Sequence, residues 1–210
     1  MQIGRVLVYL SVMITNHILL FIYWAIWCFL HSFLANESIK GGLQARFKIG
    51  NKAFRLYYNV FAFISLGLVI YYQSSVLSAL IFNVSTLIIF IGSFLVLTGF
   101  VIMLVCISKY FRQMSGIKSI TPVLITSGLN KFVRHPLYLG TFIFIGGLVV
   151  LFPTIANAGT FVIILVYTLS CIIIEEKKLV NIFGAQYIYY QQKVPMIIPF
   201  SNSLLKKFRV

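Results

Sequence analysis

Long apolar stretches, each ended by charged residues or proline, limit what this chain can fold into. A helix needs about 20 apolar residues to cross the roughly 30 Å hydrocarbon core of a bilayer. Five stretches approach or exceed that length: residues 6–34, 53–72, 83–107, 137–152 and 155–174. A helix satisfies its backbone polar groups internally, as lipid requires. The sequence therefore predicts an all-α integral membrane protein with about five transmembrane helices.

The charge balance alone would suggest a nucleic-acid-binding protein. Lysine and arginine number 17 against 3 acidic residues, for a formal net charge of +14. However, only 10% of residues are charged, 60% are hydrophobic and the mean hydropathy is +1.00. A soluble domain carries about a quarter charged residues. We therefore predict that the chain binds membrane lipids and no nucleic acid.

The basic residues indicate an orientation, because they occur in short segments between the apolar stretches. With five spans, sixteen of the seventeen fall on one side of the membrane and Arg5 alone on the other. Basic segments stay in the cytoplasm. The expected topology has the N-terminus outside and the C-terminus in the cytoplasm. Residues 137–152 and 155–174 form a helical hairpin, since Pro153 and Asn157-Ala158-Gly159 leave room only for a tight turn.

The chain has only three acidic residues, Glu37, Glu175 and Glu176, and two of them are adjacent. They stand where the fifth span meets the cytoplasmic face, followed by Lys177 and Lys178. One interpretation is a solvated helix end. The other is a functional pair, since carboxylates at a membrane boundary can hold a cationic group or accept hydrogen bonds from ribose hydroxyls.

A second polar concentration, Arg134-His135-Pro136, precedes the fourth span. Proline suits the first turn of a helix, where its missing N–H has no partner to lose, so Arg134 and His135 should lie just before that helix. A snorkelling arginine and a helix-capping histidine would explain the same residues. His31 lies within the first span, where an ionisable residue suggests function. The three cysteines show no metal-ligand spacing, and we predict no metal site.

The tail after the fifth span has an amphipathic pattern. Its apolar residues recur at spacings of four, four and three, at Leu179, Phe183, Tyr187 and Tyr190. This places them on one face of a cytoplasmic helix that ends before Pro195, with Gly184 as its weak point. The helix would either anchor at the membrane interface or close a pocket beneath the spans.

Together these pieces resemble the isoprenylcysteine carboxyl methyltransferase superfamily. The resemblance rests on Arg134-His135-Pro136-Leu137-Tyr138-Leu139-Gly140, a short hairpin, Glu175-Glu176 and the aromatic tail ending at Val194-Pro195. In the first half, Trp27, His31-Ser32-Phe33-Leu34-Ala35 and Arg55-Leu56-Tyr57-Tyr58-Asn59 resemble the bacterial branch near NnrU proteins and methanethiol S-methyltransferases.

The resemblance implies an S-adenosylmethionine-dependent methyltransferase of a bacterial inner membrane. It implies a cofactor site lined by Arg134, His135, Tyr138, Leu139, Glu175 and Glu176. Arg134 would meet the methionyl carboxylate or steady a glutamate. Arg134, His135 and His31 are the candidate catalytic residues, with His31 on the side of a small-molecule or lipid-like methyl acceptor. Residues 1–108 would form the acceptor side and residues 109–210 the methyltransferase-like region.

Two other functions stay open at this point. A reductase of the sterol-reductase type is similar in its C-terminal half and would use NADPH, although the paired glutamates suit a 2'-phosphate poorly. The other is a scaffold or small transporter without enzymatic activity. Against it, the polar residues cluster at one membrane face and not at the midplane, where transport sites lie.

Overall fold

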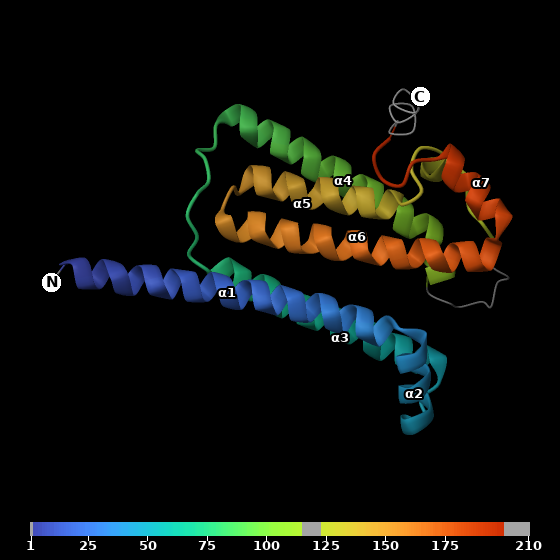
Figure 1. Cartoon of the computed structure of the whole chain (residues 1–210). Helices are drawn as coiled ribbons and strands as arrows, with labels where there is room; N and C mark the ends of the chain where they lie inside the picture. The colour runs from blue at the N-terminus through green and yellow to red at the C-terminus, as the bar shows by residue number, and fades with distance from the viewer. Residues whose placement is uncertain (1, 115–122, 200–210) are drawn as a thin grey trace, which may run out of the picture. The chain divides into compact units, whose positions relative to one another are not determined.

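The computed structural model describes residues 2–114 and 123–199 as an assembly of helices (Figure 1). In chain order the elements are α1 (Gln2–Ala35), α2 (Glu37–Phe47), α3 (Asn51–Ser75), α4 (Thr86–Met114), the 3₁₀ turn η1 (Gly128–Lys131), α5 (Pro136–Leu151), α6 (Ile155–Phe183) and α7 (Ala185–Lys193). In this part of the chain, extended pairing is limited to an isolated bridge between Leu80 and Thr154. Lys118, Lys206, Lys207 and Arg209, which the predicted topology counts as cytoplasmic, lie outside the described residues.

The apolar helices confirm the predicted all-α integral membrane protein. Four stretches in the described residues are long and apolar enough to cross a membrane: Gly4–Ala35, Asn51–Ser75, Thr86–Lys109 and Ile155–Phe183. The predicted fourth span is α5, whose 16 residues rise about 24 Å at 1.5 Å per residue. That is shorter than the usual hydrocarbon thickness. The fifth crossing and the orientation of the termini stay predictions.

Helix α2 follows α1 after a single residue and was not anticipated from the sequence. Asn36 caps it, since its side-chain oxygen accepts the N–H of Ser38 at 2.9 Å. Its 11 residues carry too few apolar positions to form a span. It runs across the neighbouring ends of α1 and α3 and not along them (Figure 1).

The chain packs as two compact units. Unit 1 comprises Met1–Ile81 and Thr154–Ile164, and unit 2 comprises Phe82–Pro153 and Leu165–Val210. In unit 1, α1 and α3 run side by side (Figure 1). Leu20 and Trp24 of α1 are buried against Ala156 at the beginning of α6. The predicted division at residue 108 concerns function and stays a prediction; by packing, α4 belongs with α5 in unit 2.

A neutral hydrogen-bond network ties the helices of unit 1 together around Gln73. Its amide oxygen accepts the indole N–H of Trp24 at 2.8 Å and the hydroxyl of Thr160 at 3.2 Å. Its amide nitrogen donates to the side-chain oxygen of Asn157 at 2.7 Å. Polar groups within apolar helices are costly unless they are paired. These bonds therefore fix how the three helices meet.

His17 is also structural, as a hydrogen-bonded histidine. One ring nitrogen lies 2.7 Å from the carbonyl of Met13, and the other lies 2.8 Å from the hydroxyl of Ser78. The Ser78 oxygen in turn accepts the N–H of Ala156 at 3.0 Å, which satisfies a donor at the beginning of α6.

Glycines bring α4 and α5 of unit 2 into backbone contact. A Cβ on Gly99 would collide with the backbone of Phe144, and one on Gly147 would lie 2.7 Å from the backbone nitrogen of Val96. Small residues permit such close approach between membrane helices. Gly92, Gly99 and Gly147 therefore pack α4 against α5 within the chain.

The predicted amphipathic tail is correct in its face but wrong in its continuity. Helix α6 runs past the apolar stretch as far as Phe183, and α7 begins only after Gly184. Gly184 has φ +54° and ψ −131°, a conformation that favours glycine. The break still leaves Leu179, Phe183, Tyr187 and Tyr190 in one apolar cluster.

Candidate functional site

The segment before α5 is held in place by the segment after α7. Pro136 occupies the first turn of α5, as predicted, and His135 precedes it as the N-cap residue. The backbone N–H of Arg134 donates to the carbonyl of Pro195 at 2.9 Å, and that of His135 donates to the carbonyl of Met196 at 3.1 Å. Two short stretches about sixty residues apart are thereby hydrogen-bonded to each other.

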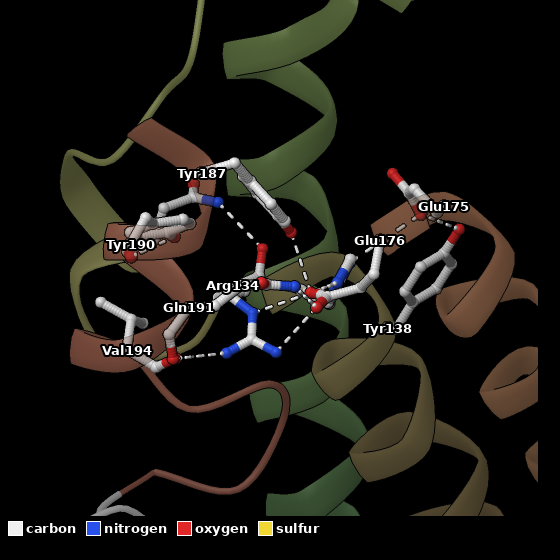
Figure 2. A network of polar contacts seen from close by, with 10 residues as sticks. Arg134, Tyr138, Glu175, Glu176, Tyr187, Tyr190, Gln191 and Val194 are labelled. Carbon is white, nitrogen blue, oxygen red and sulfur yellow. Dashed lines mark hydrogen bonds and ion pairs between the residues drawn. The ribbon is translucent and has the colours of Figure 1, made fainter. Parts of the chain in front are cut away.

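The guanidinium group of Arg134 joins α6 to the end of α7. Its Nε and Nη2 donate to the two carboxylate oxygens of Glu176 at 2.7 and 2.9 Å (Figure 2). Its Nη1 donates to the carbonyls of Gln191 and Val194. Four of its five N–H groups are thus engaged, and its side chain is only 11% exposed. Arg134 is therefore paired with Glu176 in this structure, and its predicted role toward a cofactor stays a proposal.

The carboxylate of Glu176 is the centre of this network. Besides Arg134, it accepts hydrogen bonds from His135, from the Tyr187 hydroxyl and from the Gln191 amide (Figure 2). Burial and the bond to Glu176 raise the pKa of the Tyr187 phenol well above its usual value of 10.0, so the phenol stays a neutral donor. With five donors on two oxygens, Glu176 is saturated by the protein itself.

His135 is oriented by this carboxylate. Its Nε2 lies 2.8 Å from Glu176, and because an ionised carboxylate only accepts hydrogen bonds, Nε2 carries a proton. In the neutral ring, Nδ1 then keeps its lone pair. Nδ1 lies 3.8 Å from a carboxylate oxygen of Glu175, and the side chain is 5% exposed.

Glu175 differs sharply from its neighbour. Its side chain is 44% exposed, against 13% for Glu176. One direct hydrogen bond holds it, from the hydroxyl of Tyr138 at 3.0 Å (Figure 2). Glu175 therefore retains acceptor capacity that Glu176 has already used.

A cavity of about 440 Å³ lies within unit 2 beside these side chains. Most of its wall is apolar or aromatic, and its polar groups come from few positions. Its lining comprises Val123, Leu124, Ile125, Asn130, Arg134, His135, Pro136, Leu137, Tyr138, Glu175, Leu179, Phe183, Tyr187 and Tyr190. This volume is in the usual range for small-molecule sites.

Four of the predicted site residues line this cavity: Arg134, His135, Tyr138 and Glu175. Leu139 and Glu176 do not, although Glu176 is hydrogen-bonded to three of the lining residues, Arg134, His135 and Tyr187. His31 belongs to unit 1, where its ring stacks on Trp27 with centroids 5.0 Å apart and lies within 3.2 Å of the Tyr58 hydroxyl. The predicted roles of all these residues stay proposals.

Sequence reasoning missed Asn130 and Gln191. Asn130 is buried, donates to the carbonyl of Arg134 at 3.2 Å, and its own carbonyl accepts the hydroxyl of Tyr190 at 2.6 Å. Both side chains are neutral and polar, and although Gln191 follows Tyr190, neither charge nor apolar spacing singles out either residue. Tyr187 and Tyr190 were found through their spacing and line the cavity, as expected of a tail that closes a pocket.

Comparison with known proteins identifies the family. The sequence profile of the NnrU protein family matches residues 11–198, which is most of the chain. The chain belongs to the NnrU family. No solved structure is significantly similar to it.

Individual relatives of this NnrU-family chain carry methyltransferase names. Methanethiol S-methyltransferase from Crocosphaera subtropica is 37% identical over 92 residues, covering 43% of this chain and 34% of that protein. Protein-S-isoprenylcysteine O-methyltransferase from Xenopus laevis is 34% identical over 122 residues, covering 52% and 40%. Methanethiol S-methyltransferase 1 from Bradyrhizobium diazoefficiens is 32% identical over 93 residues, covering 44% and 32%. The matched part of this chain thus spans about a third of the length of these curated relatives.

Proposed function

We propose that this protein is an integral membrane methyltransferase that uses S-adenosylmethionine at the unit 2 cavity, on the cytoplasmic side. The observation that carries the proposal is the contrast between adjacent glutamates. Glu176 is saturated by protein donors, whereas the Glu175 carboxylate is half-exposed at the cavity. The methyltransferase names of the relatives give the same class of reaction.

The chemistry of the lining fits this methyl donor. S-adenosylmethionine combines an apolar aromatic base with a cationic sulfonium, an ammonium group and ribose hydroxyls. Leu179, Phe183 and Tyr187 offer an apolar and aromatic wall for the base. Glu175 would accept hydrogen bonds from the ammonium group or the ribose. Tyr138, which donates to Glu175, would keep that carboxylate oriented.

When bound, S-adenosylmethionine supplies an electrophilic methyl group on a good leaving group. The protein must then align the acceptor with that methyl group and exclude water. The segment from Val194 to Met196 holds Arg134 and His135 in place, and these two residues line the cavity. A carboxylate acceptor needs no base, whereas a thiol acceptor must lose its proton.

For a thiol acceptor, His135 is the best-placed base among the described residues. Glu176 fixes its Nε2 as the protonated nitrogen, so Nδ1 is the atom that would take up a proton. This repeats the general arrangement in which a carboxylate orients a histidine base. Substituting Gln for His135 should lower kcat for a thiol more than affinity for S-adenosylhomocysteine. Equal losses in both would limit His135 to cofactor binding.

We place His31 on the acceptor side. It is held by Tyr58 and stacked on Trp27 in unit 1, so its ring has a defined orientation. His31→Ala should raise KM for the acceptor several-fold while leaving S-adenosylhomocysteine affinity unchanged. Tyr58→Phe is the matched control, because it removes only the hydrogen bond. A loss of cofactor affinity in His31→Ala would contradict this assignment.

The decisive experiment is calorimetric titration of the purified full chain in detergent with S-adenosylhomocysteine, and in parallel with NADPH. We expect saturable S-adenosylhomocysteine binding that Glu175→Gln weakens about tenfold, the equivalent of about 1.4 kcal/mol. The matched control is Glu37→Gln, which removes an exposed carboxylate elsewhere. Unchanged affinity in Glu175→Gln would remove Glu175 from the site.

The same titration tests the reductase alternative. Among the described lining residues, Arg134 is the only arginine or lysine, and Glu176 already neutralises it. A 2'-phosphate would therefore find no available cation in the cavity. Binding of NADPH alone would nevertheless make the protein a reductase. Binding of neither ligand by folded protein would favour a scaffold.

A further inference from the structure

Helix α2 and the beginning of α3 form a surface that the methyltransferase site does not use. Ile39, Leu43 and Phe47 recur every four residues and so share one face of α2. Ile39 and Leu43 are partly buried, whereas Phe47 at the end of this stripe is 63% exposed. An exposed phenylalanine at the edge of two apolar helices suits the boundary between headgroups and acyl chains.

Three cationic residues lie close to Phe47 in the sequence. Arg46, Lys48 and Lys52 are all exposed, and they stand on either side of the turn between α2 and α3. Glu37 is the only acidic residue of the first 174 and is paired with Lys40 at 3.1 Å. No carboxylate in this part of the sequence therefore remains to neutralise the three cations.

The turn that carries these cations is well fixed. The carbonyl of Gln44 accepts the N–H groups of Lys48 and Ile49, and the Gln44 amide donates to the side chain of Asn51 at 2.9 Å. Lys48 has φ +52°, and among the described residues it is the only one other than glycine with a positive φ. A lysine seldom adopts this conformation. The backbone that carries the three cationic residues is thus fixed by hydrogen bonds.

We propose that Arg46, Lys48 and Lys52 bind the phosphate headgroup of an anionic phospholipid, with Phe47 inserted beside its acyl chains. Helix α2 stands at a steep angle to α1 and α3 at their neighbouring ends (Figure 1), so it would lie near the membrane plane where these two helices span the bilayer. Cations beside a membrane surface attract anionic lipid. The exposed phenylalanine among them favours a lipid over a soluble phosphate or a polyanion, which would leave that ring in water.

The test is lipid binding to the purified full chain in neutral detergent, followed by native mass spectrometry. Phosphatidylglycerol is titrated against phosphatidylcholine with the same acyl chains. The main variant is the triple Arg46→Gln, Lys48→Gln, Lys52→Gln. At about 1 kcal/mol per cation, it should bind phosphatidylglycerol roughly a hundredfold more weakly and phosphatidylcholine unchanged.

The matched control removes three exposed cations from unit 2 instead: Lys131→Gln, Lys177→Gln, Lys178→Gln. It should keep phosphatidylglycerol affinity within about threefold. An equal loss in both triple variants would mean that net charge alone attracts the lipid, and it would overturn the proposal. Wild-type affinity in the main variant would overturn it too.

Two further arms separate the sources of phosphate and guard against misfolding. Glycerol phosphate at millimolar concentration should not displace the bound lipid, and displacement would indicate a site for a soluble anion. Phe47→Ser should weaken binding of phosphatidylglycerol.

If the main variant does not fold, Lys52→Gln alone should still lose about fivefold in affinity for phosphatidylglycerol. The charge-conserving Lys52→Arg should lose none, and equal affinities in these two would contradict the proposal.

Discussion

Two polar networks sit within the apolar helices of this protein, and they differ in what they can do. In unit 1, neutral side chains around Gln73 pair with one another. In unit 2, Arg134 and Glu176 form an ionic pair to which His135, Tyr187 and Gln191 add further bonds. Three members of the second network, Arg134, His135 and Tyr187, line the cavity of about 440 Å³.

The difference teaches how a membrane protein holds a charged site. Burying one charge is expensive, and burying a well-bonded pair offsets much of that cost. Glu176 and Arg134 neutralise each other and leave Glu175 as the carboxylate at the cavity. Among the described residues, the neutral network has no such charged residue beside it, and its hydrogen bonds join helices. Substitutions in the two networks should therefore separate stability from binding.

The largest effect is expected at the ionic network. Glu176→Ala leaves the mostly buried guanidinium of Arg134 without its charge partner, which should cost about 3–5 kcal/mol of unfolding free energy. Denaturant unfolding in detergent would measure it. Glu37→Ala is the control, since its exposed ion pair contributes at most about 1 kcal/mol. A similar small loss in both variants would show that the network is not structurally important.

Next in size is Gly184→Ala, at the break between α6 and α7. Alanine at φ +54° and ψ −131° is strained and should cost about 1–3 kcal/mol. Because α7 carries Tyr187 and Gln191 to Glu176, S-adenosylhomocysteine affinity should fall as well. Gly50→Ala is the control, at φ −69° with open space around it. Unchanged stability in Gly184→Ala would mean that the break relaxes without strain.

A smaller effect is expected in the neutral network. Gln73→Leu removes three hydrogen bonds within unit 1 and should cost about 0.6–1.7 kcal/mol, the range for polar contacts between membrane helices. Thermal unfolding would measure the loss, with the exposed Ser74→Ala as control. S-adenosylhomocysteine affinity should not change. A drop in affinity would show that the two networks are coupled.

The smallest effect is expected from Tyr187→Phe, which removes one of five donors to Glu176. It should cost about 1 kcal/mol near neutral pH. Because the pKa of Tyr187 is raised in the folded protein, the stability that its neutral hydroxyl contributes also depends on pH. This stability is complete below pH 10 and is lost as the pH rises beyond that value. Wild type should therefore lose more stability than the Phe variant between pH 9 and 11. Parallel losses would contradict the bond to Glu176.

Much of the fold could be predicted because the length of each apolar stretch and the positions of the charged residues can be read directly along the sequence. The five apolar stretches appear as α1, α3, α4, α5 and α6, and Pro136 begins α5 where the sequence indicated. Helix α2 was missed because its pattern is short and weakly apolar. The tail was assigned one helix because its apolar spacing continues through Gly184, and only the backbone reveals the left-handed residue there.

Four of the six residues predicted for the cofactor site line one cavity, but their arrangement could not be predicted. Arg134, His135, Tyr138 and Glu175 could be selected from motif and polarity, and they line one cavity. Gln191 could not, because an uncharged residue on a polar helix carries no signal. The sequence likewise offered no way to tell Glu175 from Glu176, since neighbours on a helix differ by about 100° in direction and only the packing decides what each one meets.

The sequence by itself determined that the chain is helical, membrane-embedded and polar at one end of its last hairpin, since these follow from hydropathy and charge along the chain. The tertiary structure alone decided that Glu176 is enclosed by Arg134, His135, Tyr187 and Gln191 while Glu175 borders the cavity. Those partners come from two segments, the residues before α5 and helix α7, and their hydrogen bonds to Glu176 of α6 exist only once the helices have packed.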